Sequence, residues 1–336
     1  MPRGPLRDRV LLPLTAPCSK GNDLPSAGSF LPILGGDLLL DALNRHLRES
    51  SADAFQGTTM LPHIAFLVKA PVLWHNKPMQ TFQSILKEID QLFAGYQARR
   101  PLSPDEQAAR YAKLRLEWTY HSNAIEGNSL TLSETQFYLR EGLTSEGKPF
   151  TDYVAAKNHA EAIDWLFDYA KGRKPITEGF IKDLNALLHK GITTQSALGW
   201  GGERIAREIS PGAYKTRPNH VLTLSGEIHH YVDPLQVHGE MEKLVEMIGA
   251  EEGKKHPVEL SAAVHYEFTR IHPFDDCNGR GARLLLNLIL MRAGFPPIVI
   301  KIEERRRYIE ALEAGDQGKR EPFYVFVAEH VRQSLQ

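Results

Sequence analysis

Residues 271–283 read Ile-His-Pro-Phe-Asp-Asp-Cys-Asn-Gly-Arg-Gly-Ala-Arg, and the fold can be worked out from this stretch outward. An apolar-faced helix is expected to end at Ile271, because Pro273 disfavours helical geometry in the residue before it. On the other side of the stretch, residues 284–290 are all Leu or Ile apart from Asn287. A helix that is apolar on nearly every side is usually buried. The stretch therefore predicts a polar loop held at the N-terminus of a buried helix.

The predicted loop has the composition of a phosphate site. Free N–H groups and the dipole at a helix N-terminus favour negative charge. Arg280 and Arg283 are three residues apart, so they extend from about the same face of the first turn. Two guanidinium groups beside exposed amides suit a polyphosphate. Asp276 offers a hard oxygen ligand for Mg²⁺, and His272 is a candidate base that can be neutral near pH 7.

Each of these residues also has a simpler interpretation. A histidine before proline is often a structural loop residue, first-turn arginines often form salt bridges, and a single aspartate there is often an N-cap. The joint spacing favours the phosphate site. His265, seven residues before His272, allows a metal site made of two histidines. A packed histidine is the favoured interpretation, because no set of Cys or carboxylate ligands completes zinc geometry.

Periodicity on both sides predicts a mainly α-helical fold. Apolar residues recur at three- and four-residue steps over residues 82–96, as on one helix face. Gly127 should end a helix that begins near Pro104, and a capping box from Thr131 to Glu134 should begin the next. β-favouring residues flank Ser225-Gly226, so one β-hairpin over residues 219–232 should lie against the helices. Further helices are expected over residues 152–171, 177–190, 235–249, 258–271, 279–293, 303–313 and 321–333.

Composition narrows the class of protein. The 336 residues carry a net charge of −1, so nothing indicates a nucleic-acid or membrane partner. No apolar run has the length of a membrane span. Cys18 and Cys277 are the only cysteines, which favours a reducing, cytoplasmic compartment. Residues 1–79 are rich in proline and glycine and are expected to be a partly irregular segment of unknown function.

The central stretch resembles the motif of the Fic family, His-Pro-Phe-x-Asp/Glu-Gly-Asn-Gly/Lys-Arg-x-x-Arg. This sequence differs from the motif at one specified position, where it has Cys277 and the family has glycine. The specified positions that match are His272, Pro273, Phe274, Asp276, Asn278, Gly279, Arg280 and Arg283.

The resemblance extends over about residues 80–336. Residues 122–128 look like the family's Ser/Thr-x-x-x-Glu-Gly/Asn inhibitory motif, and Ser122 and Glu126 share a helix face. The resemblance implies a Fic-type helical bundle with one β-hairpin flap. It divides the chain into the segment 1–79, a helical region carrying the inhibitory motif (80–145) and a catalytic core (146–336) with the flap at about 212–233.

The resemblance implies a protein adenylyltransferase, which transfers AMP from ATP to a Ser, Thr or Tyr hydroxyl of a target protein. It makes His272 the catalytic base, Asp276 the Mg²⁺ ligand and Phe274 an apolar anchor of the loop. Glu126, with Ser122 on the same helix face, would pair with Arg283 and occupy the place of the γ-phosphate. The residues expected to bind the phosphates of ATP are Cys277 through its amide, Asn278, Gly279, Arg280 and Arg283.

The resemblance also implies a docking site for the target protein. Residues 211–215 resemble the start of the flap, where targets dock by strand addition, and this makes Tyr214 and Lys215 docking candidates. It is also compatible with a homodimer.

Three other functions stay open at this point. The same site could remove AMP from a modified protein, with Glu126 positioning a water molecule. It could transfer a different nucleotide or phosphocholine. The chain could also be a non-catalytic Fic-like regulatory module.

Cys277 raises a separate question. A thiol near a helix N-terminus and two arginines should have a lowered pKa and be nucleophilic. A buried thiol that points away from the site would be inert. If the position needs a positive φ, cysteine costs about 1–2 kcal/mol there.

Overall fold

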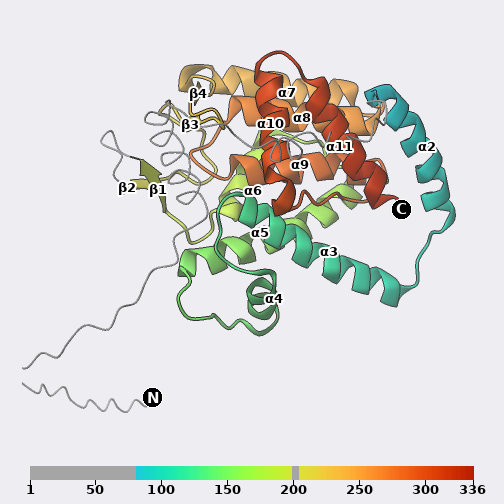
Figure 1. The fold of residues 1–336 in the computed structure, drawn as a ribbon, viewed down its shortest axis with the longest axis horizontal. Coiled ribbons are helices and arrows are strands. Elements are labelled where there is room, and N and C mark those ends of the chain that lie inside the picture. The colour runs from blue at the N-terminus through green and yellow to red at the C-terminus, as the bar shows by residue number, and fades with distance from the viewer. Residues whose placement is uncertain (1–80, 199–203) are drawn as a thin grey trace, which may run out of the picture. The chain divides into compact units, whose positions relative to one another are not determined.

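The computed structural model describes residues 81–198 and 204–336, and all of them belong to one compact unit of the chain (Figure 1). The predicted segment 1–79, including Cys18, lies outside the described residues. No helix in the described part of the chain combines the length and the apolar character that crossing a membrane requires.

The described residues form a mainly α-helical fold, as predicted. In chain order the elements are α2 (Phe82–Ala98), α3 (Pro104–Ile125), α4 (Leu132–Glu141), α5 (Phe150–Gly172), α6 (Glu178–Leu188), β1 (Thr194–Leu198), β2 (Arg204–Glu208), β3 (His220–Leu222), β4 (Ile228–His230), α7 (Pro234–Glu251), α8 (Pro257–Ile271), α9 (Asn278–Arg292), a 3₁₀ turn (Ile302–Glu304), α10 (Arg305–Asp316) and α11 (Glu321–Ser334).

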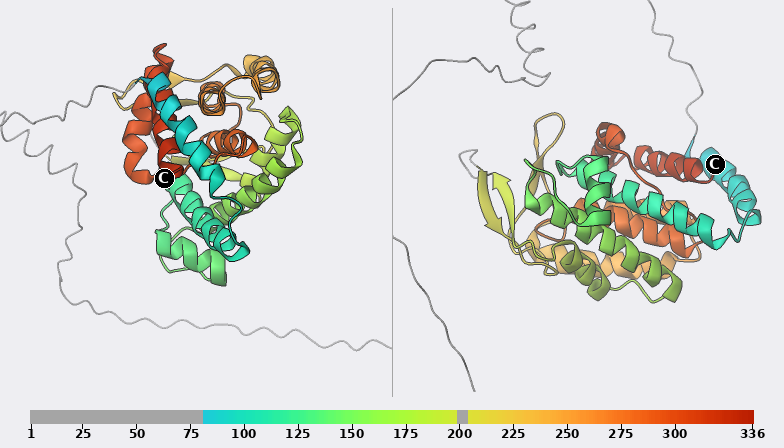
Figure 2. Two further views of the ribbon diagram at one scale, coloured as in Figure 1. Left: turned by 90° about the vertical axis from the view of Figure 1, so that its right-hand side faces the viewer. Right: turned by 90° about the horizontal axis from the view of Figure 1, so that it is seen from below.

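Helix α9 is the centre of the bundle. Its leucine and isoleucine side chains are buried on every side, which confirms the prediction made from residues 284–290. It packs along α8 and also contacts α3, α5 and α6 (Figures 1 and 2). Because α9 is surrounded, residues of its first turn can be reached by side chains from several helices at once.

The ends of α3 place its last turn beside α9. The helix begins with a capping box between Ser103 and Glu106, and Pro104 occupies its first turn. It ends at Ile125 with Glu126 as C-cap, and Gly127 follows with φ +90°, a conformation that suits glycine. The capping box predicted at Thr131 is present at the start of α4. The sequence therefore indicated where this helix begins and ends.

The structure contains two β-hairpins within the described residues, whereas the sequence predicted one. The predicted hairpin is β3–β4, and it is tied to α10 by a 2.8 Å hydrogen bond from the Leu224 N–H to Glu313 Oε1. The second hairpin pairs β1 with β2, from Thr194 opposite Glu208 to Leu198 opposite Arg204. The single-hairpin prediction was wrong because most residues in β1 and β2 are small, polar or charged and have little β-propensity.

Candidate active site

One amide side chain holds the loop between α8 and α9. Asn278 Oδ1 accepts a hydrogen bond from the Phe274 N–H at 3.0 Å, and Asn278 Nδ2 donates to the Phe274 carbonyl at 2.9 Å. Phe274 is buried, with its ring near those of Phe268 and Tyr214. The sequence assigned Asn278 to phosphate binding. Its amide bonds the backbone of Phe274 and so shapes the loop, and phosphate binding by Asn278 stays a prediction.

The two ends of the loop have left-handed backbone. His272 has φ +51° and Cys277 has φ +63°, although both carry a Cβ atom. Such conformations cost about 1–2 kcal/mol per residue and persist where the surrounding structure imposes them. Strained backbone of this kind gathers at functional sites, so it marks residues 272–277 as a candidate site.

His272 is held as a neutral imidazole with one defined tautomer. Its Nδ1 lies 3.3 Å from the Thr269 carbonyl, which can only accept, so the proton belongs on Nδ1 and the lone pair on Nε2. The ring stacks on Tyr231, with centroids 3.7 Å apart and planes 14° from parallel. Burial, followed by the charge of Lys215, lowers the pKa of His272 to about 3. His272 can therefore accept a proton at Nε2 near neutral pH.

The first turn of α9 concentrates positive charge behind one carboxylate. Arg280 and Arg283 are both buried. Arg280 Nη2 lies 3.1 Å from Asp276 Oδ2. Burial raises the pKa of Asp276, but other causes, of which the charge of Arg280 is the largest, outweigh it and hold that pKa well below its usual range. Asp276 is therefore ionised and available to a hard cation.

Glu126 reaches this helix turn from α3. Its Oε1 lies 2.7 Å from Arg283 Nη2, and the same guanidinium donates to Ser122 Oγ at 3.0 Å and to the Ser122 carbonyl at 2.8 Å. A Cβ atom added at Gly279 would overlap Glu126 Oε1. The carboxylate thus rests directly on the backbone at the start of α9, where an anion is favoured.

The flap residues lie deeper than the sequence suggested. Lys215 is buried; its N–H donates to the Pro273 carbonyl at 2.8 Å and its Nζ to the Ile271 carbonyl at 3.3 Å. Tyr214 is partly buried and its hydroxyl donates to Glu178 Oε2 at 2.8 Å. Both side chains therefore support the His272 loop, and their role in docking a target stays a prediction. The exposed apolar residues of the hairpin are Val221, Leu222, Leu224 and Ile228.

Cys277 differs from the reactive thiol that the sequence predicted. Its side chain is buried, and burial raises the pKa of the thiol above its usual value despite the nearby charge of Arg280. The prediction of a lowered pKa was wrong because loss of water around the thiolate outweighs the attraction of the arginines. Its amide precedes the first turn of α9, as expected.

Several residues near the site were not identified from the sequence. His189, at the end of α6, places Nε2 3.6 Å from Asp276 Oδ2. Asn185 on α6 donates to the Asp276 carbonyl at 3.0 Å and accepts from the Gly212 N–H at 2.9 Å. Neither belongs to a recognisable motif, so only the packing of α6 could identify them. His265 is fully buried against Phe323 and hydrogen-bonded to Tyr308, which confirms a packed histidine.

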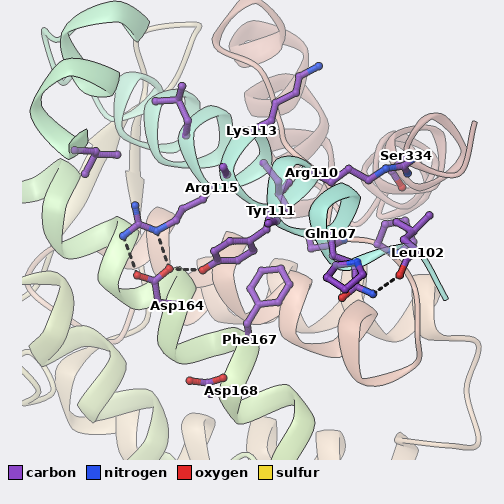
Figure 3. A pocket seen from close by; sticks show the side chains of 18 of the residues that line it. Leu102, Gln107, Arg110, Tyr111, Lys113, Arg115, Asp164, Phe167, Asp168 and Ser334 are labelled. Carbon is purple, nitrogen blue, oxygen red and sulfur yellow. Dashed lines mark hydrogen bonds and ion pairs between the residues drawn. The ribbon is translucent and has the colours of Figure 1, made fainter. Parts of the chain in front are cut away.

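A separate groove runs along α3 and α5 (Figure 3). It encloses about 1430 Å³. On one wall Asp164 accepts from both Arg115 and Tyr111, and the Tyr111 ring meets Phe167 edge to face. None of the residues that line this groove is one of the predicted site residues.

Comparison with known proteins agrees with this geometry. The family model described as Fic/DOC family matches residues 175–290. The chain is 30% identical over 226 residues to protein adenylyltransferase fic-1 of Caenorhabditis elegans, covering 65% of this chain and 40% of that protein. It is 31% identical over 210 residues to protein adenylyltransferase Fic of Nematostella vectensis, covering 62% and 45%. The chain thus spans less than half the length of these curated relatives.

A solved structure matches a larger share of the chain than these two relatives do. The crystal structure of a Fic domain containing signaling protein from Bacteroides thetaiotaomicron aligns with a TM-score of 0.66 and 34% sequence identity. The match covers 74% of this chain and 94% of that one.

Proposed function

Because the chain belongs to the Fic/DOC family, we propose that it transfers AMP from ATP to a Ser, Thr or Tyr hydroxyl of a target protein. The observation that carries this proposal is His272, a neutral base at the N-terminus of a helix whose first turn holds two buried arginines. A proton acceptor beside a phosphate-binding turn is what phosphoryl-type transfer requires.

The proposed reaction begins with the target hydroxyl near His272. Nε2 accepts the hydroxyl proton while the oxygen forms a bond to the α-phosphorus of ATP. The bond from that phosphorus to the bridging oxygen breaks, and pyrophosphate leaves. The stacked Tyr231 and the Thr269 carbonyl keep the imidazole in one orientation. Most of the catalytic effect then comes from positioning and charge stabilisation.

Asp276 fits the Mg²⁺ that ATP brings. The carboxylate is ionised, and its side chain is 38% exposed beside the first turn of α9. Mg²⁺, when bound, neutralises charge on the phosphates. Arg280 and the amides of residues 277–279 would hold the β-phosphate, and Arg283 would hold the γ-phosphate.

Glu126 inhibits the reaction in this proposal. Its carboxylate occupies the helix N-terminus and engages Arg283 at 2.7 Å, so the γ-phosphate and Glu126 compete for one guanidinium. A second candidate function uses the same residue. The Glu126 side chain is 38% exposed at the site, so it could position water for removal of AMP from a modified protein.

Labelled ATP tests the proposed function. The 336-residue chain carrying Glu126→Gly, incubated with Mg²⁺ and ATP labelled at the α-phosphate, should become covalently labelled and should label protein in a cell lysate. His272→Ala in the same background should lose about 10²–10⁴-fold in rate while still binding ATP. An unlabelled Glu126→Gly protein, or undiminished labelling with His272→Ala, would overturn the proposal. The cytoplasmic location and the homodimer stay predictions.

A further inference from the structure

Three potential metal ligands meet behind the loop. Within the described residues, one ligand atom each from His189, Asp276 and Cys277 lies within 4.8 Å of the other two. They come from the end of α6 and from the residues before α9. None of the roles proposed above uses the His189 imidazole or the Cys277 thiol.

The imidazole of His189 lacks a partner at the atom that faces this cluster. Its side chain is 3% exposed. Nδ1 lies 3.1 Å from the Asn185 carbonyl and therefore carries the proton, which leaves the lone pair on Nε2. Nε2 has no hydrogen-bond partner among the described residues, and Asp276 Oδ2 lies 3.6 Å away. In the neutral ring this lone pair faces the carboxylate, and a cation between the two groups, a metal ion or a second ring proton, removes their repulsion.

The spacing fits a tetrahedral ion of the zinc class. Ligand atoms at about 2.0–2.3 Å from such an ion are separated by about 3.4–3.6 Å from each other. The separation between His189 Nε2 and Asp276 Oδ2 already has this value, 3.6 Å. Imidazole, carboxylate and thiolate are all zinc ligands, and a thiolate selects against Mg²⁺.

We propose that His189, Asp276 and Cys277 form a binding site for Zn²⁺ or a similar thiophilic divalent cation. Binding forms the metal–sulfur bond as Cys277 Sγ releases its proton to solvent. The side chain of Asp276 is 38% exposed, which provides an entry path and leaves the fourth position to water. Arg280 Nη2 lies 3.1 Å from the same Asp276 Oδ2, so the guanidinium competes with the ion for this oxygen and lowers the affinity of the site.

The site would also regulate the enzyme, an inference that rests on the proposed function. Asp276 is the residue proposed to hold the Mg²⁺ of ATP, so one carboxylate would serve two cations. Occupancy by Zn²⁺ should therefore inhibit AMP transfer in this chain, in which Cys277 stands where the family motif has glycine.

A cadmium titration tests the site without reference to activity. The full chain carrying Cys18→Ser, freed of metal, is titrated with Cd²⁺ while the ultraviolet thiolate-to-cadmium charge-transfer band is recorded. We expect one Cd²⁺ per chain, displacement of the band by Zn²⁺ and no displacement by excess Mg²⁺. Adding Cys277→Ser should abolish the band, and His189→Gln should weaken the affinity at least about tenfold.

The matched control is His238→Gln. His238 also faces a carboxylate, with Nδ1 3.2 Å from Glu178 Oε2, but it is exposed and has no role in the cluster. This variant should bind Cd²⁺ like the parent. Absence of the band in the parent, an equal band with Cys277→Ser, or unchanged affinity with His189→Gln would overturn the site.

Two further measurements test metal binding and the inhibition of AMP transfer separately. X-ray absorption of the Zn²⁺-loaded parent requires no cluster variant and should show one sulfur at about 2.3 Å with nitrogen or oxygen at about 2.0–2.2 Å. A zinc coordination shell without a sulfur ligand would overturn the proposal. In the Glu126→Gly background, Zn²⁺ should reduce AMP transfer severalfold more with Cys277 than with Cys277→Ser. Metal binding without this difference would overturn the regulation alone, and inactivity without metal would count against the proposed function alone.

Discussion

At His272, burial and a neighbouring charge act in the same direction on one imidazole. Both lower its pKa, to about 3, so protonation begins well below the pH at which a free histidine titrates. The base is therefore neutral throughout the physiological range. This neutral form is the one that the proposed reaction requires.

The pH dependence of AMP transfer should report this shift. In the Glu126→Gly background, the acid limb of kcat/KM should lie well below pH 6.5. Lys215→Met removes the charge that is the second cause of the shift, so the pKa of His272 should rise and the limb should move to higher pH. A limb that stays in place would exclude Lys215 as a cause.

The ion pair between Glu126 and Arg283 controls whether the guanidinium is available to ATP in the proposed function. Their ion pair is short, and the arginine is buried, so breaking it releases a guanidinium for ATP. A charge-assisted hydrogen bond contributes about 1.5–3 kcal/mol. Glu126→Gly should therefore raise the rate of self-modification by roughly ten- to a hundredfold, as measured by intact mass.

The control for this variant is the same substitution elsewhere on α3. Glu117 pairs with Lys113 one turn away and has no contact with Arg283. Glu117→Gly should leave the rate of self-modification near that of the chain without substitutions. An equal increase in both variants would mean that a weakened α3, and not the lost carboxylate, activates the enzyme. Loss of AMP removal from a pre-modified target in Glu126→Gly would support the reverse reaction.

At the scale of elements, the junction of α8 and α9 depends on Asn278. Its amide satisfies the N–H and the carbonyl of Phe274, both in a buried setting. Asn278→Ala leaves those two groups without these partners, so the free energy of unfolding should fall by about 1–3 kcal/mol. Urea denaturation measures this loss. An unchanged midpoint would show that the loop does not depend on the amide.

The β3–β4 hairpin should affect transfer to other proteins more than self-modification. Ile228 is 58% exposed on β4, beside the exposed Val221 and Leu222 on β3. An apolar side chain at the centre of a contact typically contributes more than about 1 kcal/mol. Ile228→Asp should therefore reduce labelling of lysate proteins by about fivefold or more in the Glu126→Gly background.

A matched variant tests whether this effect is local. Leu235 at the start of α7 is 95% exposed, so Leu235→Asp adds the same charge outside the hairpin. It should leave labelling of lysate proteins unchanged. Equal losses in the two variants would assign the effect to net charge and not to docking on the hairpin.

At the scale of the whole molecule, α3, α6, α8 and α9 bring distant parts of the chain to one helix turn. Glu126 and Arg283 are 157 residues apart in sequence and 2.7 Å apart in space. The resemblance to the Fic family anticipated that meeting, because both residues belong to recognised motifs. His189 belongs to none, and its meeting with Asp276 follows only from the packing of α6 near α9.

The sequence by itself determined the local structure of this protein. Helix boundaries such as Ser103 to Glu126, the capping box at Thr131, and the loop before a buried α9 all depend on neighbours within a few residues. Hydrophobic periodicity and backbone preferences are read directly from such neighbours. Most of the residues proposed for the site also lie in one short stretch, 272–283, which is why a resemblance in sequence could point to them.

Only the tertiary structure decided which polar atoms remain available. The Asn278 amide bonds the backbone of Phe274, Lys215 is buried against the same loop, and the thiol of Cys277 is desolvated. It also paired β1 with β2, whose residues have little strand preference of their own. Burial and hydrogen-bond partners are supplied by segments far apart in the chain, so a local sequence pattern cannot predict them.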